Sequence, residues 1–296
     1  MPVPGSPALV AVTGSHGLVG SALVRDLGAS GHAVRRVTRD PASGALDLRA
    51  VADADAVVHL AGENIAGGRW THERKRKIHD SRVLTTRALA EALAARERPP
   101  RVLVSASGIN SYGDRGDERL TEESPRGHGF LADLCREWEG ATAPAEAHGV
   151  RVVHLRIGMV LSRHGGALAK MLLPFRLGLG GVIGSGDQWM SWIALDDLVG
   201  VIRHALTTDA LRGPLNAVAP ESVTNREFSR ALARALRRPA LLPVPAFAAR
   251  LALGEMADAL LLASIRVEPA RLLASGYAFR HPTLAAALAH ELGARA

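Results

Sequence analysis

The sequence predicts an α/β fold, with a doubly wound parallel sheet followed by a smaller, mainly helical C-terminal lobe. Strand-like apolar runs alternate with helix-like segments through the first half of the chain, which is typical of a parallel sheet covered on both faces by helices. Beyond about Arg163 the loops lengthen and gain glycine, and helices dominate after Asp196. We therefore expect two units, residues 8–220, with substrate-side elements from about 163, and residues 221–296.

Apolar runs bounded by glycine and proline place the expected elements. Strands are expected at Ala8–Thr13, Ala33–Thr38, Ala45–Leu48, Ala56–Leu60, Arg101–Ser107 and Val150–Ile157. Helices are expected at Leu18–Ala29, Thr71–Ala95, Phe130–His148 and Arg226–Leu236, the last preceded by a capping-box pattern of Thr224 with Glu227. Ligands of such sheets bind beyond the carboxyl ends of the strands, so the residues that follow each strand are the candidates for a site.

Composition narrows the class of function. Apolar residues make up 47% of the 296 residues, enough for a sizeable core, whereas aromatic residues are only 4%, too few for the stacking platforms of a single-strand nucleic-acid binder. The net charge of +7 fits either a compositional bias or attraction of an anionic ligand. The single cysteine, Cys135, fits a reducing cytoplasm, and no apolar run is long enough to span a membrane. We expect a cytoplasmic monomer or homodimer without a nucleic-acid or membrane partner.

Glycines recur at every third position between the first expected strand and the first expected helix. Gly14 permits a tight turn, Gly17 lets the backbone approach a pyrophosphate, and Gly20 lets helix and strand pack closely. The N–H groups at the helix start then face the phosphates, and the helix dipole favours negative charge there. This pattern predicts a Rossmann-type dinucleotide site. The residues of this turn that are expected to contact the cofactor are Gly14, Ser15, Gly17, Leu18, Val19 and Gly20.

The end of the second strand bears on the choice of dinucleotide. NAD binders usually carry Asp or Glu there, which bonds the ribose 2′-hydroxyl. Here no acidic residue occurs before Asp40, and Thr38 with Arg39 suits a 2′-phosphate through charge-assisted hydrogen bonds. The sequence therefore favours NADP over NAD as the cofactor. The alternative is that Arg35, Arg36 and Arg39 only solvate the strand end.

The glycine turn, followed by His59-Leu60-Ala61-Gly62 after a strand, resembles the extended short-chain dehydrogenase/reductase superfamily. More narrowly, the chain is similar to the epimerase-family group that carries a small C-terminal domain of unassigned function. The stretches that carry this resemblance are Leu60–Ile65, Arg69–Trp70, Asp80–Arg82, Pro174–Gly181 and Gly254–Ala257. The resemblance extends from Ala8 to about Leu288.

The resemblance implies further cofactor contacts. These are Leu60, Ala61, Gly62, Lys77, Arg82 and Val160. Leu60 and Ala61 would lie along the adenosine ribose and pyrophosphate, Arg82 would reach the cofactor from the other side, and Val160 would lie near the nicotinamide. Lys77 belongs to a run of charged residues, so a solvated helix face is the alternative interpretation.

The usual catalytic set of the superfamily is incomplete in this chain. Short-chain dehydrogenases use Ser or Thr with a Tyr and a Lys four residues apart on a helix, where the Lys lowers the pKa of the Tyr that moves a proton during hydride transfer. Ser107 occupies the expected serine place, but the helix segment Phe130–Arg136 has neither Tyr nor Lys. Tyr112, in the loop after Ser107, is the candidate substitute acid, and packing beneath the loop is the alternative.

Other polar residues near the strand ends extend the list of candidates. Glu63 is the alternative base, and Lys170 is a candidate for binding an anionic group of the substrate. Asp196 and Asp197 suit a helix N-cap better than acid–base work. The histidines are spread singly, without paired spacing for zinc, so no metal is expected.

Two functions remain open at this point. The first is an NADP-dependent oxidoreductase or epimerase with an atypical catalytic set that acts on a small molecule. The second is an NADP-binding sensor or partner-binding protein with little turnover. The missing Tyr and Lys favour the second, whereas the pocket motifs Gln188-Trp189 and Trp192 favour the first.

Overall fold

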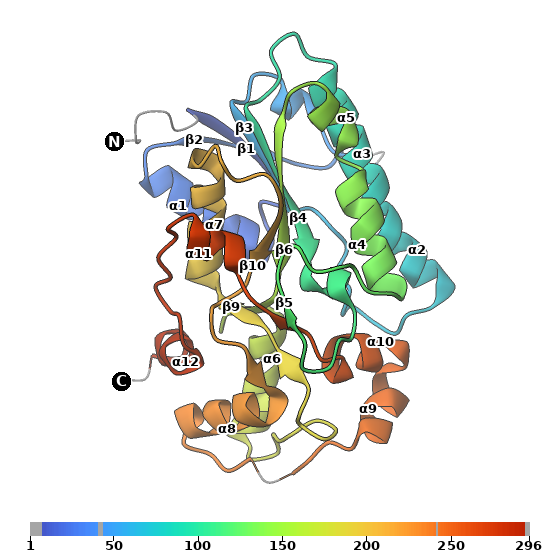
Figure 1. The fold of residues 1–296 in the computed structure, drawn as a ribbon, viewed down its shortest axis with the longest axis vertical. Helices are drawn as coiled ribbons and strands as arrows, with labels where there is room; N and C mark the ends of the chain where they lie inside the picture. The colour runs from blue at the N-terminus through green and yellow to red at the C-terminus, as the bar shows by residue number, and fades with distance from the viewer. Residues whose placement is uncertain (1–7, 41–43, 241, 294–296) are drawn as a thin grey trace.

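A six-stranded parallel sheet forms the centre of the protein in a computed structural model that describes residues 8–40, 44–240 and 242–293 (Figure 1). The strand order is β10-β6-β4-β3-β1-β2, and every pairing is parallel. The six strands are β1 (Leu9–Thr13), β2 (Ala33–Val37), β3 (Ala56–His59), β4 (Val102–Gly108), β6 (Arg151–Ile157) and β10 (Gly213–Ala217). The chain runs outward from β1 to β2 and then crosses to β3 on the other side of β1, so the strand order reverses at β1. Such a reversal is where ligands bind in open α/β sheets.

Helices cover both faces of the sheet, which confirms the predicted fold class (Figure 1). They are α1 (Leu18–Ala29), α2 (His72–Asp80), α3 (Val83–Ala94), α4 (Phe130–Gly140), α5 (Ala143–Ala147) and α7 (Leu195–Thr207). Within β1, Val10 and Val12 pack into a cluster with α1 and α7, whereas Ala11 packs into a cluster with α3 and α5. Because both faces are covered, the strand is apolar from Leu9 to Val12 instead of alternating with polar residues.

A mainly helical region packs at one end of the sheet. Its elements are β7 (Met159–Leu161), α6 (Gly166–Arg176), β8 (Trp189–Met190), β9 (Trp192–Ala194), β11 (Val223–Thr224), α8 (Asn225–Leu236), α9 (Ala246–Leu253), α10 (Glu255–Ala257), the π-helical turn η3 (Asp258–Leu262), β12 (Arg266–Val267), α11 (Ala270–Ala274) and α12 (Leu284–Leu292). The capping box of Thr224 and Glu227 is formed at the start of α8, as predicted. β12 pairs with β5 (Arg119–Leu120), so the C-terminal segment returns to the sheet domain. The predicted boundary near residue 220 stays a prediction.

Three element predictions were wrong. The expected strand Ala45–Leu48 is replaced by one isolated bridge at Leu46 and the 3-10 helix η1 (Leu48–Val51). The expected helix Thr71–Ala95 is broken between α2 and α3, where the Ser81 hydroxyl donates to the carbonyl of Ile78 and so competes with the helical pattern. The expected helix Phe130–His148 is also divided, into α4 and α5.

No helix in the described ranges is long and apolar enough to cross a membrane.

Candidate functional site

Steric crowding explains the glycines between β1 and α1. Gly14 has a φ of 64°, and a Cβ atom there would lie 2.7 Å from the carbonyl carbon of Leu60. A Cβ atom on Gly20 would lie 2.2 Å from the carbonyl oxygen of Gly14. Gly14 is therefore required for both its left-handed backbone and its lack of a side chain. Gly20 is required only because it has no side chain, which lets α1 approach the turn closely.

The start of α1 has features that suit an anion. Gly17 is the N-cap residue, no side chain caps the helix, and its first turn holds no acidic residue. Ser15 is 1% exposed, and its buried hydroxyl has no hydrogen-bond partner among the described residues. A buried hydroxyl without a partner is costly, and a phosphate oxygen at the helix N-terminus would satisfy it. The residues present therefore fit the pyrophosphate of a dinucleotide.

A buried hydrogen-bond chain fixes the backbone opposite the glycine turn. The N–H groups of Leu60 and Ala61 both donate to Thr13 Oγ1 at 3.1 Å. Thr13 Oγ1 lies 2.8 Å from His59 Nδ1, and His59 Nε2 lies 2.9 Å from Thr86 Oγ1. Since Thr13 Oγ1 already accepts two N–H groups, its own proton points to Nδ1, and the neutral imidazole carries its proton on Nε2. This chain holds the predicted contacts Leu60 and Ala61 against the turn.

The charge state of His59 follows from its surroundings. The side chain is fully buried, and burial together with the positive charge of Arg39 lowers the pKa of His59 to about 4. The imidazole is therefore neutral at physiological pH.

The arginines at the end of β2 have different partners. Arg36 Nη1 donates to the carbonyl oxygen of Ser15 at 2.7 Å, so its guanidinium lies against the glycine turn. Arg39 Nη1 donates to the carbonyl of Gly44 at 2.7 Å, whereas Arg35 pairs with Asp53. The sequence pattern predicted Arg39, and not Arg36, as a contact of the 2′-phosphate. The available signal was the expected parallel pairing of the first two strands, which sets Arg36 opposite Val12, just before the turn. Thr38 is exposed between the two arginines.

Arg82 lies at the break between α2 and α3, and no carboxylate within the described part of the chain forms an ion pair with it. Its Nη1 donates to the carbonyl of Ile78 at 3.2 Å, and its guanidinium lies over the Trp138 ring at 5.1 Å. A Cβ atom on Gly62 would lie 3.2 Å from Arg82 Cζ, so the predicted contacts Gly62 and Arg82 are neighbours. Burial lowers the pKa of Arg82. A partly buried cation without a carboxylate partner is suited to an anionic ligand.

Lys77 and Val160 lie in different surroundings. Lys77 Nζ pairs with Glu73 Oε1 at 2.7 Å, and both side chains are more than 60% exposed, as on a solvated helix face. Val160 is half-buried in β7, pairs with Ile193 of β9 and packs against the core cluster that contains α1. Their cofactor contacts stay predictions.

The candidate catalyst Ser107 belongs to a buried set of polar groups at the carboxyl ends of β4 and β6. Ser107 Oγ donates to Glu139 Oε1 at 2.7 Å. Arg156 binds the same carboxylate through two contacts of 2.9 and 3.0 Å, and Arg126 adds a third at 2.5 Å. Burial acts to raise the pKa of Glu139, but the hydrogen bonds and charge of Arg156 outweigh it, so the pKa of Glu139 is lowered.

Tyr112 extends this set, which we call the Glu139 network. Tyr112 is fully buried; its hydroxyl donates to Asn216 Oδ1 at 2.7 Å and accepts from Arg156 Nη1 at 2.9 Å. Burial raises the pKa of Tyr112, and the nearby Arg156 offsets only part of that effect. The members are Ser107, Tyr112, Arg126, Glu139, Arg156 and Asn216. Both predicted catalytic hydroxyls are thus committed to internal partners, and their catalytic roles stay predictions.

Other candidates are held by neighbouring groups. Glu63 Oε1 pairs with Arg74 at 2.7 Å, and Lys170 is exposed on α6. Cys135 is buried within α4 without a disulfide partner, as expected of a small core residue, and burial raises the pKa of its thiol to about 11.

The expected N-cap role of Asp196 and Asp197 was wrong. Ala194 is the N-cap residue of α7, without a side-chain cap, and both aspartates lie in the first turn. The Asp197 carboxylate accepts instead from the backbone N–H groups of Arg280 and His281, because the C-terminal segment passes close to the start of α7.

The parallel sheet, its reversal at β1 and the glycine turn define a Rossmann-type protein of the short-chain dehydrogenase/reductase kind. The chain belongs to the NAD dependent epimerase/dehydratase family, because residues 10–217 match that family model. Residues 244–291 match a domain of unknown function, DUF1731. This confirms the resemblance seen in the sequence.

Relatives match along nearly the whole chain. An epimerase family protein of Mycobacterium tuberculosis is 43% identical over 96% of this chain and 97% of its own length. The human epimerase family protein SDR39U1 is 41% identical over 94% of this chain and 98% of its own length. A crystal structure of the human protein with NADPH has a TM-score of 0.90 at 39% identity, covering 97% of this chain and 100% of that one. Thermus thermophilus UDP-glucose 4-epimerase, solved with NAD, shares the fold at 22% identity and a TM-score of 0.74, over 97% and 100% of the two chains.

Proposed function

We propose that this protein binds NADP(H) and is an oxidoreductase or epimerase of small molecules with an atypical proton-transfer set. The observation that carries the proposal is the unsatisfied donor set at the start of α1, where Ser15 Oγ is buried without a partner in the described structure and α1 lacks a side-chain cap. The presence of NADPH in the structure of the human relative supports the same cofactor here.

Residues of the glycine turn, the start of α1 and the end of β2 would each bind a different part of the cofactor. The N–H groups of Leu18 and Val19 and the hydroxyl of Ser15 would bind the pyrophosphate. Arg36 and Arg39 would bind the 2′-phosphate through charge-assisted hydrogen bonds. Once bound, the cofactor would supply hydride transfer through its nicotinamide.

A titration of the full chain with NADPH and NADH tests this proposal. NADPH is expected to bind more tightly, and Arg39→Ala or Arg36→Ala should each weaken NADPH by roughly 10- to 100-fold, since a hydrogen bond to a charged group contributes about 1.5–3 kcal/mol. NADH affinity should change little. Arg35→Ala is the matched control, because this arginine on the same strand already pairs with Asp53. Equal or tighter binding of NADH would overturn the NADP assignment.

Turnover is a separate question. Catalysis by Ser107 or Tyr112 would require the substrate to displace an internal partner, Glu139 for the serine or Asn216 for the tyrosine. The test is NADPH oxidation over a panel of carbonyl compounds and sugar nucleotides. Activity that Ser107→Ala and Tyr112→Phe abolish, while NADPH still binds, would support both as catalysts.

A second function, an NADP(H)-binding sensor with little turnover, is favoured by one observation. The hydroxyls of Ser107 and Tyr112 are both buried and hydrogen-bonded within the Glu139 network. Tight NADPH binding without oxidation across the substrate panel would support this function over the first.

A further inference from the structure

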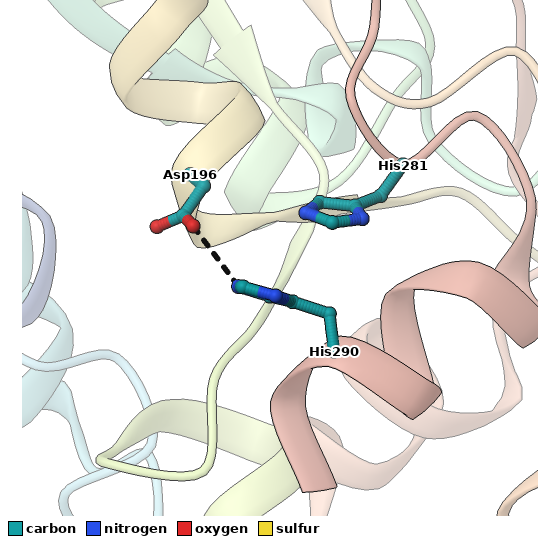
Figure 2. Close-up of side chains that lie close together, drawn as sticks. All are labelled: Asp196, His281 and His290. Carbon is teal, nitrogen blue, oxygen red and sulfur yellow. Dashed lines mark hydrogen bonds and ion pairs between the residues drawn. The ribbon is translucent and has the colours of Figure 1, made fainter. Parts of the chain in front are cut away.

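Three potential metal ligands from different parts of the chain lie close together at the N-terminal end of α7 (Figure 2). Asp196 comes from the first turn of α7, His281 from the segment before α12, and His290 from α12 itself. One ligand atom from each lies within 4.8 Å of the other two. His290 Nε2 is 3.0 Å from Asp196 Oδ2, and the two imidazole rings are stacked with their centroids 4.3 Å apart.

We propose that Asp196, His281 and His290 bind one divalent metal ion of the zinc class. Imidazole nitrogen and carboxylate oxygen bind Zn²⁺ at about 2.0–2.2 Å, and two histidines with one carboxylate form a known three-ligand set that leaves a fourth position to water. Donors at that distance in a tetrahedral site are separated by roughly 3.3 Å, close to the observed His290–Asp196 separation. His281 would have to turn out of its stack on His290 so that one of its ring nitrogens points to the same ion.

The backbone around His281 is already held in place without an ion. The Asp197 carboxylate accepts from the N–H groups of Arg280 at 2.7 Å and His281 at 2.9 Å, and Asp197 itself is fully buried. At the start of α12, Leu284 N donates to Glu221 Oε2 at 2.5 Å. Binding therefore requires side-chain adjustment but no folding of a loop, which lowers the cost of assembling the site.

The position of the site indicates a structural role. α7 packs with α1 against one face of the sheet, whereas α12 packs in a separate cluster with α6 and α8. An ion shared by Asp196 and His290 would join the last helix to the sheet domain. The side chains of these two residues are 42% and 45% exposed, so solvent can reach the open coordination position. None of the three residues belongs to the proposed cofactor site, so the two proposals can fail independently.

The experiment is a Zn²⁺ titration of the full, chelator-treated chain by calorimetry, with the metal content measured after dialysis. The expected result is one ion per chain and a higher thermal midpoint in Zn²⁺, because an ion that binds only the folded state stabilises it. His281→Ala, His290→Ala and Asp196→Asn should each weaken Zn²⁺ binding by at least about tenfold, a change already common for residues that merely support a metal ligand.

Controls separate this site from general binding to histidines. His148→Ala removes an exposed histidine elsewhere and should leave Zn²⁺ affinity unchanged. Where a variant fails to fold, Co²⁺ added to the unmodified protein should shift the proton NMR resonances of two imidazoles and give the visible absorption of a tetrahedral site. The absence of a bound ion, or full binding by the His281→Ala/His290→Ala double variant, would overturn the proposal.

Discussion

At the two halves of the sheet's carboxyl edge, the predicted site residues differ in whether they have hydrogen-bond or ion-pair partners within the protein. At β1–β3, Ser15 Oγ is buried without a partner in the described structure and Arg82 forms no ion pair there, whereas Thr13, His59 and Thr86 are hydrogen-bonded to one another. At β4 and β6, Ser107 and Arg156 share the carboxylate of Glu139, although Ser111 Oγ, just beyond β4, is buried without a partner in the described structure. The hydroxyl of Ser15 at a helix N-terminus can be satisfied by an anionic ligand, whereas the pairing of Glu139 with Arg156 stabilises the fold. The glycine turn is therefore suited to binding a ligand, and the Glu139 network to holding the protein together.

The largest expected effect comes from breaking the Glu139 network. Glu139→Ala leaves Arg156 buried without its carboxylate, which should lower the free energy of unfolding by about 3–5 kcal/mol. Urea denaturation measures this change. Asp133→Ala on the same helix breaks an exposed pair with Arg136 and should cost less than about 1 kcal/mol. Equal effects of the two substitutions would mean that the Glu139 network contributes no more to stability than an exposed ion pair does.

Acid should destabilise the β1–β3 half through His59. Its pKa is about 4 in the folded protein against an ordinary 6.5, so only the unfolded chain takes up a proton as the pH falls below 6.5. The contribution of His59 to the free energy of unfolding is therefore complete above pH 6.5. It is lost as the pH falls toward 4, which lowers the free energy of unfolding by about 3 kcal/mol for this group alone. Thermal unfolding across this range should show a shallower loss in His59→Gln, and His148→Gln, at an exposed position, should match the unmodified protein. Identical pH profiles for the unmodified protein and His59→Gln would contradict a buried neutral imidazole.

A substitution that crowds the glycine turn should weaken ligand binding more than the same substitution at an uncrowded glycine of α1. Gly20→Ala brings a methyl group against the Gly14 carbonyl, so α1 must move, and NADPH affinity should fall roughly 10- to 100-fold, since a 1 Å misplacement costs about that much elsewhere. Gly28→Ala on the same helix meets nothing within 4 Å. It should leave affinity unchanged and raise stability by about 0.4–1 kcal/mol. Unaltered NADPH binding by Gly20→Ala would place the cofactor elsewhere.

The smallest expected effect is that of Tyr112→Phe. This substitution removes hydrogen bonds to Asn216 and Arg156 and should lower stability by about 1 kcal/mol, without changing NADPH affinity. Denaturation and cofactor titration on the same preparation test both statements. Loss of NADPH binding with unchanged stability would assign Tyr112 to the ligand site instead of the Glu139 network.

Local patterns in the sequence were sufficient for the glycine turn and for β1, β2, β3, β4 and β6, but they missed β10 and indicated a strand at Ala45–Leu48 that does not form. Gly14, Gly17 and Gly20 directly follow a strand and begin a helix. Their role can therefore be inferred from residues that are adjacent in the sequence. The break at Ser81 was missed because a single hydroxyl in a helical pattern does not reveal which carbonyl it will bond. Arg36 was passed over because its contact with Ser15 depends on how two strands pair.

The sequence by itself determined the fold class, the dinucleotide turn and the absence of an acidic residue at the end of β2, because each is encoded within a short stretch of chain. Only the tertiary structure decided that Ser107 and Tyr112 are committed to Glu139 and Asn216, and that two single histidines meet Asp196. These partners are remote in sequence, and residue types alone do not encode which distant groups will meet. Whether a hydroxyl is available to a substrate or is held in the structure depends on its hydrogen-bond partner, and that partner is determined by the tertiary fold.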